Sequence, residues 1–114
     1  METGKAGDVI IFRCRGPIVF GEEASELHVL VRAALAETGK VVLALGGVTY
    51  LDSAGIGTLF GIYTSSITHR GRLRLACLTP RVRQTLEMSK LLDLVEVSES
   101  EEDALRALAE TAAN

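Results

Sequence analysis

The sequence predicts a single α/β domain over residues 1–114, with a mostly parallel mixed sheet, an N-terminal β-hairpin and about four helices. Short apolar runs typical of buried strands alternate with longer segments whose apolar residues recur every three or four positions, as in helices. The predicted order is two strands and a helix, followed by three strand–helix pairs, which is typical of a sheet built from right-handed crossovers. A chain of 114 residues fits one domain.

The N-terminal elements are predicted to be two short strands and a helix. Residues 8–15 alternate as a strand does, Gly16-Pro17 signals a turn, and Ile18-Val19-Phe20 completes the predicted hairpin. The helix begins after Gly21, with glutamates in its first turns where the helix dipole favours them, and ends near Gly39. Its predicted buried stripe is Ala24, Leu27, Leu30, Val31 and Ala34.

The central strand and helix meet at Asp52. Residues 41–45, VVLAL, form a short apolar run typical of a strand buried on both faces, which two glycines interrupt and residues 48–51 resume. From Ile56 the apolar residues follow helical spacing, so a helix begins near Ser53. Asp52 and Ser53 are both good N-cap residues, and a helix start is a place where an anion is tolerated.

Three glycines inside this predicted helix, Gly55, Gly57 and Gly61, each cost about 1 kcal/mol relative to alanine. Close helix–sheet packing is one explanation, and the ordinary one for any single glycine. A surface on which another protein docks is the other.

The C-terminal half continues the alternation. Residues 72–77 alternate as a strand, and Thr79-Pro80 is a strong opening for a short helix, because a capping hydroxyl precedes a proline whose missing N–H costs nothing there. A last strand lies around residues 94–97. Ser98 and Glu101 have the spacing of a capping box, which predicts the final helix.

Net charge, hydropathy and the cysteine and histidine positions argue against several classes of protein. The net charge of −3 argues mildly against a nucleic-acid binder, and the absence of a signal peptide or bilayer-length apolar run favours a cytoplasmic protein without membrane insertion. Cys14 and Cys77 are expected to be buried thiols and not a disulfide. Together with His28 and His69 they lack zinc-site spacing, so we expect neither a metal nor a cofactor.

Catalytic motifs fit poorly. Gly55-Ile56-Gly57 lacks the third glycine of a dinucleotide fingerprint at Phe60, and no lysine follows as in a P-loop. Ser53 stands where a nucleophile elbow would place its serine, but the first glycine of that motif is Leu51 and no Asp-then-His pair follows. We therefore predict no catalytic residue and no enzyme; a hydrolase that uses Ser53 is the alternative, and a serine-reactive probe would label it.

The segments Gly47 to Gly57 (GVTYLDSAGIG) and Leu78 to Arg83 (LTPRVR), with Leu86-Glu87 and the element order, resemble the STAS family. That family comprises bacterial anti-sigma factor antagonists and cytosolic domains of sulphate transporters. The resemblance implies a partner-switching protein that binds an anti-sigma factor, itself a serine/threonine kinase, and so controls transcription. A phosphatase is a further candidate partner. The implied partner-binding residues are Asp52, Ser53, Ala54, Gly55, Ile56, Gly57, Thr58, Gly61 and Ser65, of which Gly57, Thr58, Gly61 and Ser65 are expected on an exposed flank.

The sequence departs from the family at two positions. Members that are switched carry two hydroxyl residues after the aspartate and are phosphorylated on the second, but the second position here is Ala54. Either Ser53 accepts the phosphate, or the protein binds its partner without this switch and Ser53 serves as an N-cap. Val19 stands where antagonists often have an aspartate, and residues 16–20 look more like the transporter branch.

An alternative function comes from that transporter branch. The chain would then be an accessory subunit or ligand-binding module of a membrane transport system. It would take a nucleotide, lipid or anion at the turn from Asp52 to Gly57. Neighbouring genes would separate this hypothesis from the first.

Overall fold

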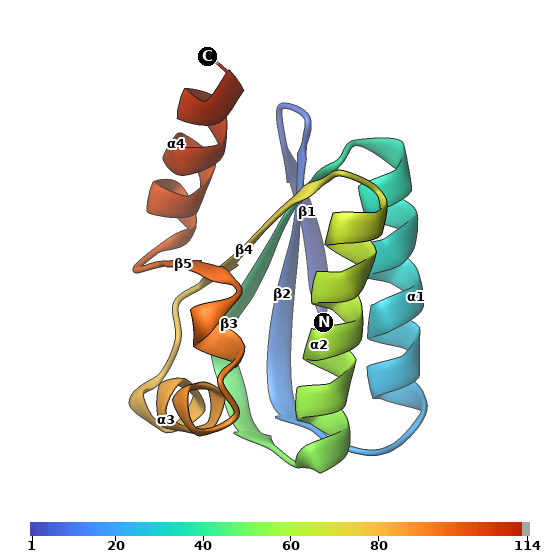
Figure 1. Ribbon diagram of the computed structural model, residues 1–114, viewed down its shortest axis with the longest axis vertical. Coiled ribbons are helices and arrows are strands. Elements are labelled where there is room, and N and C mark those ends of the chain that lie inside the picture. The colour runs from blue at the N-terminus through green and yellow to red at the C-terminus, as the bar shows by residue number, and fades with distance from the viewer. Residues whose placement is uncertain (113–114) are drawn as a thin grey trace.

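The structure, a computed structural model, describes residues 1–112 and consists of one sheet with helices on both faces (Figure 1). The elements are β1 (Glu2–Ala6), β2 (Val9–Ile18), α1 (Glu22–Glu37), β3 (Lys40–Leu51), α2 (Ser53–Thr68), β4 (Arg72–Ala76), α3 (Pro80–Met88), a single 3-10 turn η1 (Leu91–Asp93), β5 (Glu96–Ser98) and α4 (Glu101–Ala112). The predicted fold class is confirmed.

The sheet has the order β1-β2-β3-β4-β5, with β1 antiparallel to β2 and every other pair parallel. Since β2, β3 and β4 run in the same direction, the connections that leave them lie along one edge of the sheet, the lower edge in Figure 1. The starts of α1, α2 and α3 therefore gather at that edge. This is where ligands and partners of open α/β sheets commonly bind.

The N-terminal hairpin is present, but the strands predicted for it were wrong. Residues 9–18 form one strand, and its hairpin partner is β1, which the sequence did not reveal because its residues, ETGKA, show no apolar alternation. The turn falls at Gly7, whose φ of +61° suits glycine. Gly16-Pro17 instead marks an irregularity within β2, where Gly16 has a φ of +70° and the register against β3 shifts.

The core has two layers. The larger one lies between the sheet and α1, α2 and α3, and the smaller one lies under α4. β3 contributes to both, because Val41, Leu43 and Leu45 face the larger layer while Val42 and Ala44 face α4. The prediction that residues 41–45 are buried on both faces is confirmed, whereas Gly46, Gly47, Thr49 and Tyr50 of the same strand are exposed.

Two details of the helices differ from prediction. In α1, Leu30 is exposed, and Leu35 is buried in its place, because Leu27, Val31 and Leu35 follow one i, i+4 line. The final helix is capped by Ser100, whose hydroxyl oxygen accepts the backbone N–H of Asp103 at 3.0 Å, and not by the predicted Ser98. Ser98 cannot serve as the cap because it ends β5.

Candidate docking site at the β3–α2 turn

Asp52 organises the turn between β3 and α2. It adopts extended backbone, and its Oδ1 accepts the backbone N–H of Gly55 at 2.7 Å, which makes it the N-cap of α2. Its Oδ2 accepts the backbone N–H of Phe20 at 3.1 Å. These two hydrogen bonds, the one from Gly55 above all, lower the pKa of the Asp52 carboxyl below its ordinary value. One carboxylate thus joins the start of α2 to the connection between β2 and α1.

Ser53 is the first residue of α2 and is exposed. Of the two candidate caps, Asp52 and not Ser53 caps α2, because Asp52 supplies the extended backbone and the oxygen acceptor that a cap requires. Over residues 1–112, the Ser53 hydroxyl makes no hydrogen bond. The side chain is therefore open to another molecule.

The three glycines of α2 have different roles. A Cβ at Gly55 would overlap the carbonyl oxygen of Ile18, so the bare backbone is needed for helix and strand to approach. A Cβ at Gly61 would lie 2.7 Å from Cε1 of His28 on α1. A Cβ at Gly57 would meet no described atom within 4 Å, and Gly57 is exposed. Packing accounts for Gly55 and Gly61, but not for Gly57.

The predicted exposed flank of α2 is only partly exposed. Ser65 is buried, at 8% exposure, and its hydroxyl lies 3.3 Å from Nε2 of His28. The expectation that Ser65 is accessible is wrong, and Gly61 is only half-exposed, because α1 lies alongside this face of α2 (Figure 1). Ile56 also packs against the core. At the turn, Ser53 and Gly57 are exposed, and Asp52, Ala54, Ile56 and Thr58 are half-buried.

An open hollow separates the starts of α1 and α2. It has a volume of about 470 Å³ and is lined by Phe20, Gly21, Glu22, Ala24, Ser25, Ala54 and Thr58. The Thr58 hydroxyl donates to the carbonyl of Ala54 at 3.0 Å, which leaves its methyl group and the Ala54 methyl group as small apolar contacts beside the hollow. A protein side chain of moderate size fits such a space.

Phe20 is the functional candidate that sequence reasoning missed. Its side chain is 86% exposed, the largest exposure among the exposed large hydrophobic residues of the described chain. In the sequence it ends the apolar run Ile18-Val19-Phe20, which predicted a strand, yet β2 ends at Ile18. The signal that could have found it is Gly21, which marks the start of α1 and therefore requires the strand to end before Phe20.

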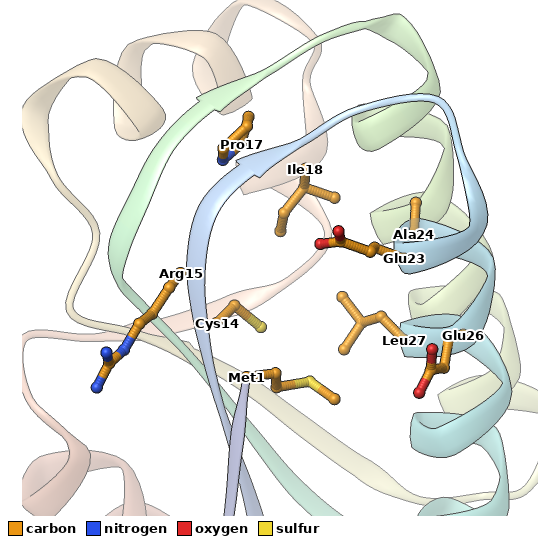
Figure 2. Close-up of a pocket in the computed structure, with 9 residues that line it drawn as sticks. All are labelled: Met1, Cys14, Arg15, Pro17, Ile18, Glu23, Ala24, Glu26 and Leu27. Atoms are coloured by element: carbon orange, nitrogen blue, oxygen red, sulfur yellow. The ribbon is translucent and has the colours of Figure 1, made fainter.

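A second hollow lies between β2 and α1 (Figure 2). Its volume is about 290 Å³, and its lining is Met1, Cys14, Arg15, Pro17, Ile18, Glu23, Ala24, Glu26 and Leu27, none of which belongs to the turn from Asp52 to Gly57. Figure 2 shows the Cys14 thiol and the Leu27 side chain directed toward the space between strand and helix. Burial raises the pKa of the Cys14 thiol to about 11.

The geometry offers Ser53 no catalytic partner among the residues that the structure describes. His28 pairs with Ser65, and Nδ1 of His69 lies 2.9 Å from the carbonyl oxygen of Ser65. Over residues 1–112, no group of three or more His, Cys, Asp or Glu side chains is placed to hold a metal ion. Within the same range, no helix combines the length and the apolar character that crossing a bilayer requires.

Comparison with known proteins gives concordant results. A family model described as the STAS domain matches residues 1–104. BtrV of Bordetella bronchiseptica, which carries the name of an anti-sigma factor antagonist, is 31% identical over 102 residues, covering 88% of this chain and 87% of BtrV.

Solved structures show the same arrangement of elements. A crystal structure from Thermotoga maritima, described as that of an anti-sigma factor antagonist, has a TM-score of 0.84 at 20% identity, covering 93% of this chain and 92% of that one. The STAS domain of a SulP transporter from Vibrio cholerae has a TM-score of 0.78 at 25% identity, covering 97% and 89%.

Proposed function

Because the chain belongs to the STAS domain family, we propose that it is an anti-sigma factor antagonist that acts by binding and not by catalysis. It binds an anti-sigma factor that is also a serine/threonine kinase, in the cytoplasm of a bacterium, and the sigma factor is thereby released for transcription. The similarity to BtrV over most of both chains supports this function above others.

The observation that carries the proposal is the construction of the turn at Asp52. Its carboxylate holds two connections together, so the surface between them is rigid before any partner arrives. A preformed surface binds at a smaller entropic cost than one that must be ordered. We call this the docking surface and define it as Phe20, Asp52, Ser53, Ala54, Gly57 and Thr58.

We further propose Ser53 as the residue that the kinase phosphorylates. The Ala54 side chain has no hydroxyl, whereas the Ser53 hydroxyl is exposed and makes no hydrogen bond within the described chain. A phosphate there would carry about two negative charges next to the Asp52 carboxylate, although the start of α2 tolerates an anion. The added charge and volume on the docking surface would end binding.

The test uses the purified anti-sigma factor kinases of the source organism. Each is incubated with the chain and ATP, and the site of phosphate is read by mass spectrometry, with Ser53→Ala as the control. We expect one kinase to modify Ser53 and the phosphorylated chain to bind that kinase at least tenfold more weakly. Phosphate on Thr58 would overturn the assignment of Ser53. Tight binding without any phosphate would show a partner that is bound without the switch.

The second candidate function is a STAS module of a transport system. The similarity to the Vibrio cholerae SulP domain favours it. In that case the chain would co-purify with a membrane transporter of the source organism, and it would bind none of its anti-sigma factors. A gene for a kinase or phosphatase beside this one favours the antagonist, and genes for transporter subunits favour the transport module.

A further inference from the structure

We propose that Phe20 is the hydrophobic anchor of the docking surface and determines which anti-sigma factor is bound. The partner then presents an apolar pocket with basic side chains around it. This inference rests on the proposed function, since it specifies the chemistry of the partner at the same surface.

The exposure of Phe20 is the first reason. A phenylalanine side chain carries about 150–250 Å² of surface, and at 86% exposure nearly all of it meets solvent in the free protein. Buried aromatic anchors dominate the energetics of many protein interfaces. Phe20 also lines the hollow that Ala54 and Thr58 border, so a partner on the docking surface would cover it.

The second reason is that the backbone of Phe20 is held in place. Residues 19–21 join the end of β2 at Ile18, which is buried, to the start of α1 at Glu22. The hydrogen bond from the Phe20 N–H to Asp52 Oδ2 ties the middle of this short connection to α2. The ring therefore projects from a fixed point, and binding need order only its own side-chain torsions.

The charge around Phe20 specifies the rim of the partner's pocket. Glu22 lines the first hollow, and Glu22 and Glu23 both line a third hollow beside Phe20, between residues 15–17 and 19–23. The Asp52 carboxylate accepts the hydrogen bond of the Phe20 backbone. Arg15 also lines the second and third hollows, but it forms a 3.7 Å ion pair with Glu2 of β1. The excess of negative charge favours a partner with arginine or lysine around its pocket, and it disfavours an anionic lipid surface.

The experiment is a calorimetric titration of wild-type chain and variants with the purified anti-sigma factor kinases of the source organism. Phe20→Ala is expected to weaken binding at least 30-fold, and Phe20→Leu, which keeps an apolar side chain, markedly less. The matched control is Ile67→Ala, which removes a side chain of 60% exposure near the far end of α2, about 21 Å from Ser53 along the helix. It should bind like wild type.

The possible outcomes separate the anchor from the function on which it rests. If the wild-type chain binds none of the kinases, the proposed function itself fails. If Thr58→Arg abolishes binding while Phe20→Ala stays within threefold of wild type, the docking surface stands and the anchor is overturned.

Two further arms test the chemistry of the partner. Changing Glu22 and Glu23 together to lysine should slow association at least fivefold at low salt, with the difference fading at high salt. Unchanged or faster association would overturn the basic rim. Sedimentation of wild-type chain, but not Phe20→Ala, with phosphatidylglycerol vesicles would show that the ring serves a membrane and would overturn the protein pocket.

Discussion

The backbone N–H of Phe20 donates to Oδ2 of Asp52 at 3.1 Å, a contact that spans 32 positions in the sequence. The other oxygen of the same carboxylate caps α2 through Gly55. Because one side chain makes both contacts, Asp52 links the start of α2 to the connection before α1. A substitution at Asp52 should therefore alter both the start of α2 and the connection before α1.

Replacing Asp52 by asparagine should separate its two functions. The asparagine oxygen can still accept the Gly55 N–H, but its NH₂ group cannot accept the N–H of Phe20. We expect α2 to keep its start while the Phe20 amide exchanges with solvent at least tenfold faster, as measured by hydrogen exchange. Asp52→Ala, which removes both acceptors, should increase exchange at Gly55 as well. Equal protection of the Phe20 amide in wild type and Asp52→Asn would contradict the tether.

The same carboxylate predicts a pH dependence. The pKa of Asp52 is lowered in the folded chain, so its ionised form contributes stability that is fully present above the ordinary aspartate value of 3.8. That contribution is lost as the pH falls through the lower pKa of the folded chain. In an NMR titration the amide signals of Gly55 and Phe20 should move together below pH 3.8. They should show no such step in Asp52→Asn, and separate midpoints for the two amides in wild type would count against a shared carboxylate.

The glycines of α2 provide a matched pair of substitutions. Gly61→Ala places a methyl group 2.7 Å from the His28 ring, which is half-buried and bonded to Ser65, so we expect about 1–3 kcal/mol of destabilisation. Gly57→Ala meets open space in an exposed helical position and should stabilise by up to about 1 kcal/mol. Urea denaturation of the two variants measures both effects. Equal free energies of unfolding for the two variants would mean that His28 of α1 does not lie close enough to Gly61 to clash with a methyl group.

The two cysteines should differ in reactivity. Cys14 is 5% exposed and the pKa of its thiol is raised to about 11, so at pH 8 almost none of it is thiolate. Cys77 is half-exposed, so the expectation that it is buried is wrong. A disulfide reagent at pH 8 should label Cys77 at least tenfold faster in the folded chain and both residues in denaturant, as followed by mass spectrometry. Comparable rates in the folded chain would show that Cys14 is not shielded.

The start of α2 could be predicted because its signals are local. An apolar strand, a capping residue and the helical spacing from Ile56 lie within a few residues of one another, and each indicates the same boundary. The choice of Asp52 over Ser53 as the cap was open from sequence, because both side chains suit that position. The structure decides it through the extended backbone at Asp52.

The errors concern contacts between distant segments. Gly61 and Ser65 share a line with Gly57 on α2, and nothing in that spacing shows that His28 of α1 covers two of the three. β1 has a polar sequence and is a strand because β2 offers it an edge to pair with. The exposure of Phe20 likewise depends on where β2 ends. The sequence did not show this end, because Ile18 and Val19 continue the apolar pattern up to Phe20.

The most direct test of the docking surface is an NMR titration of labelled chain with the unlabelled anti-sigma factor kinase of the source organism. If the docking surface binds the kinase, loss or shift of amide signals should concentrate at Phe20, Ser53, Ala54, Gly57 and Thr58. The amide signals of Ile67 and of α4 should not move. Changes confined to β5 and α4, with the signals around Asp52 unmoved, would contradict it.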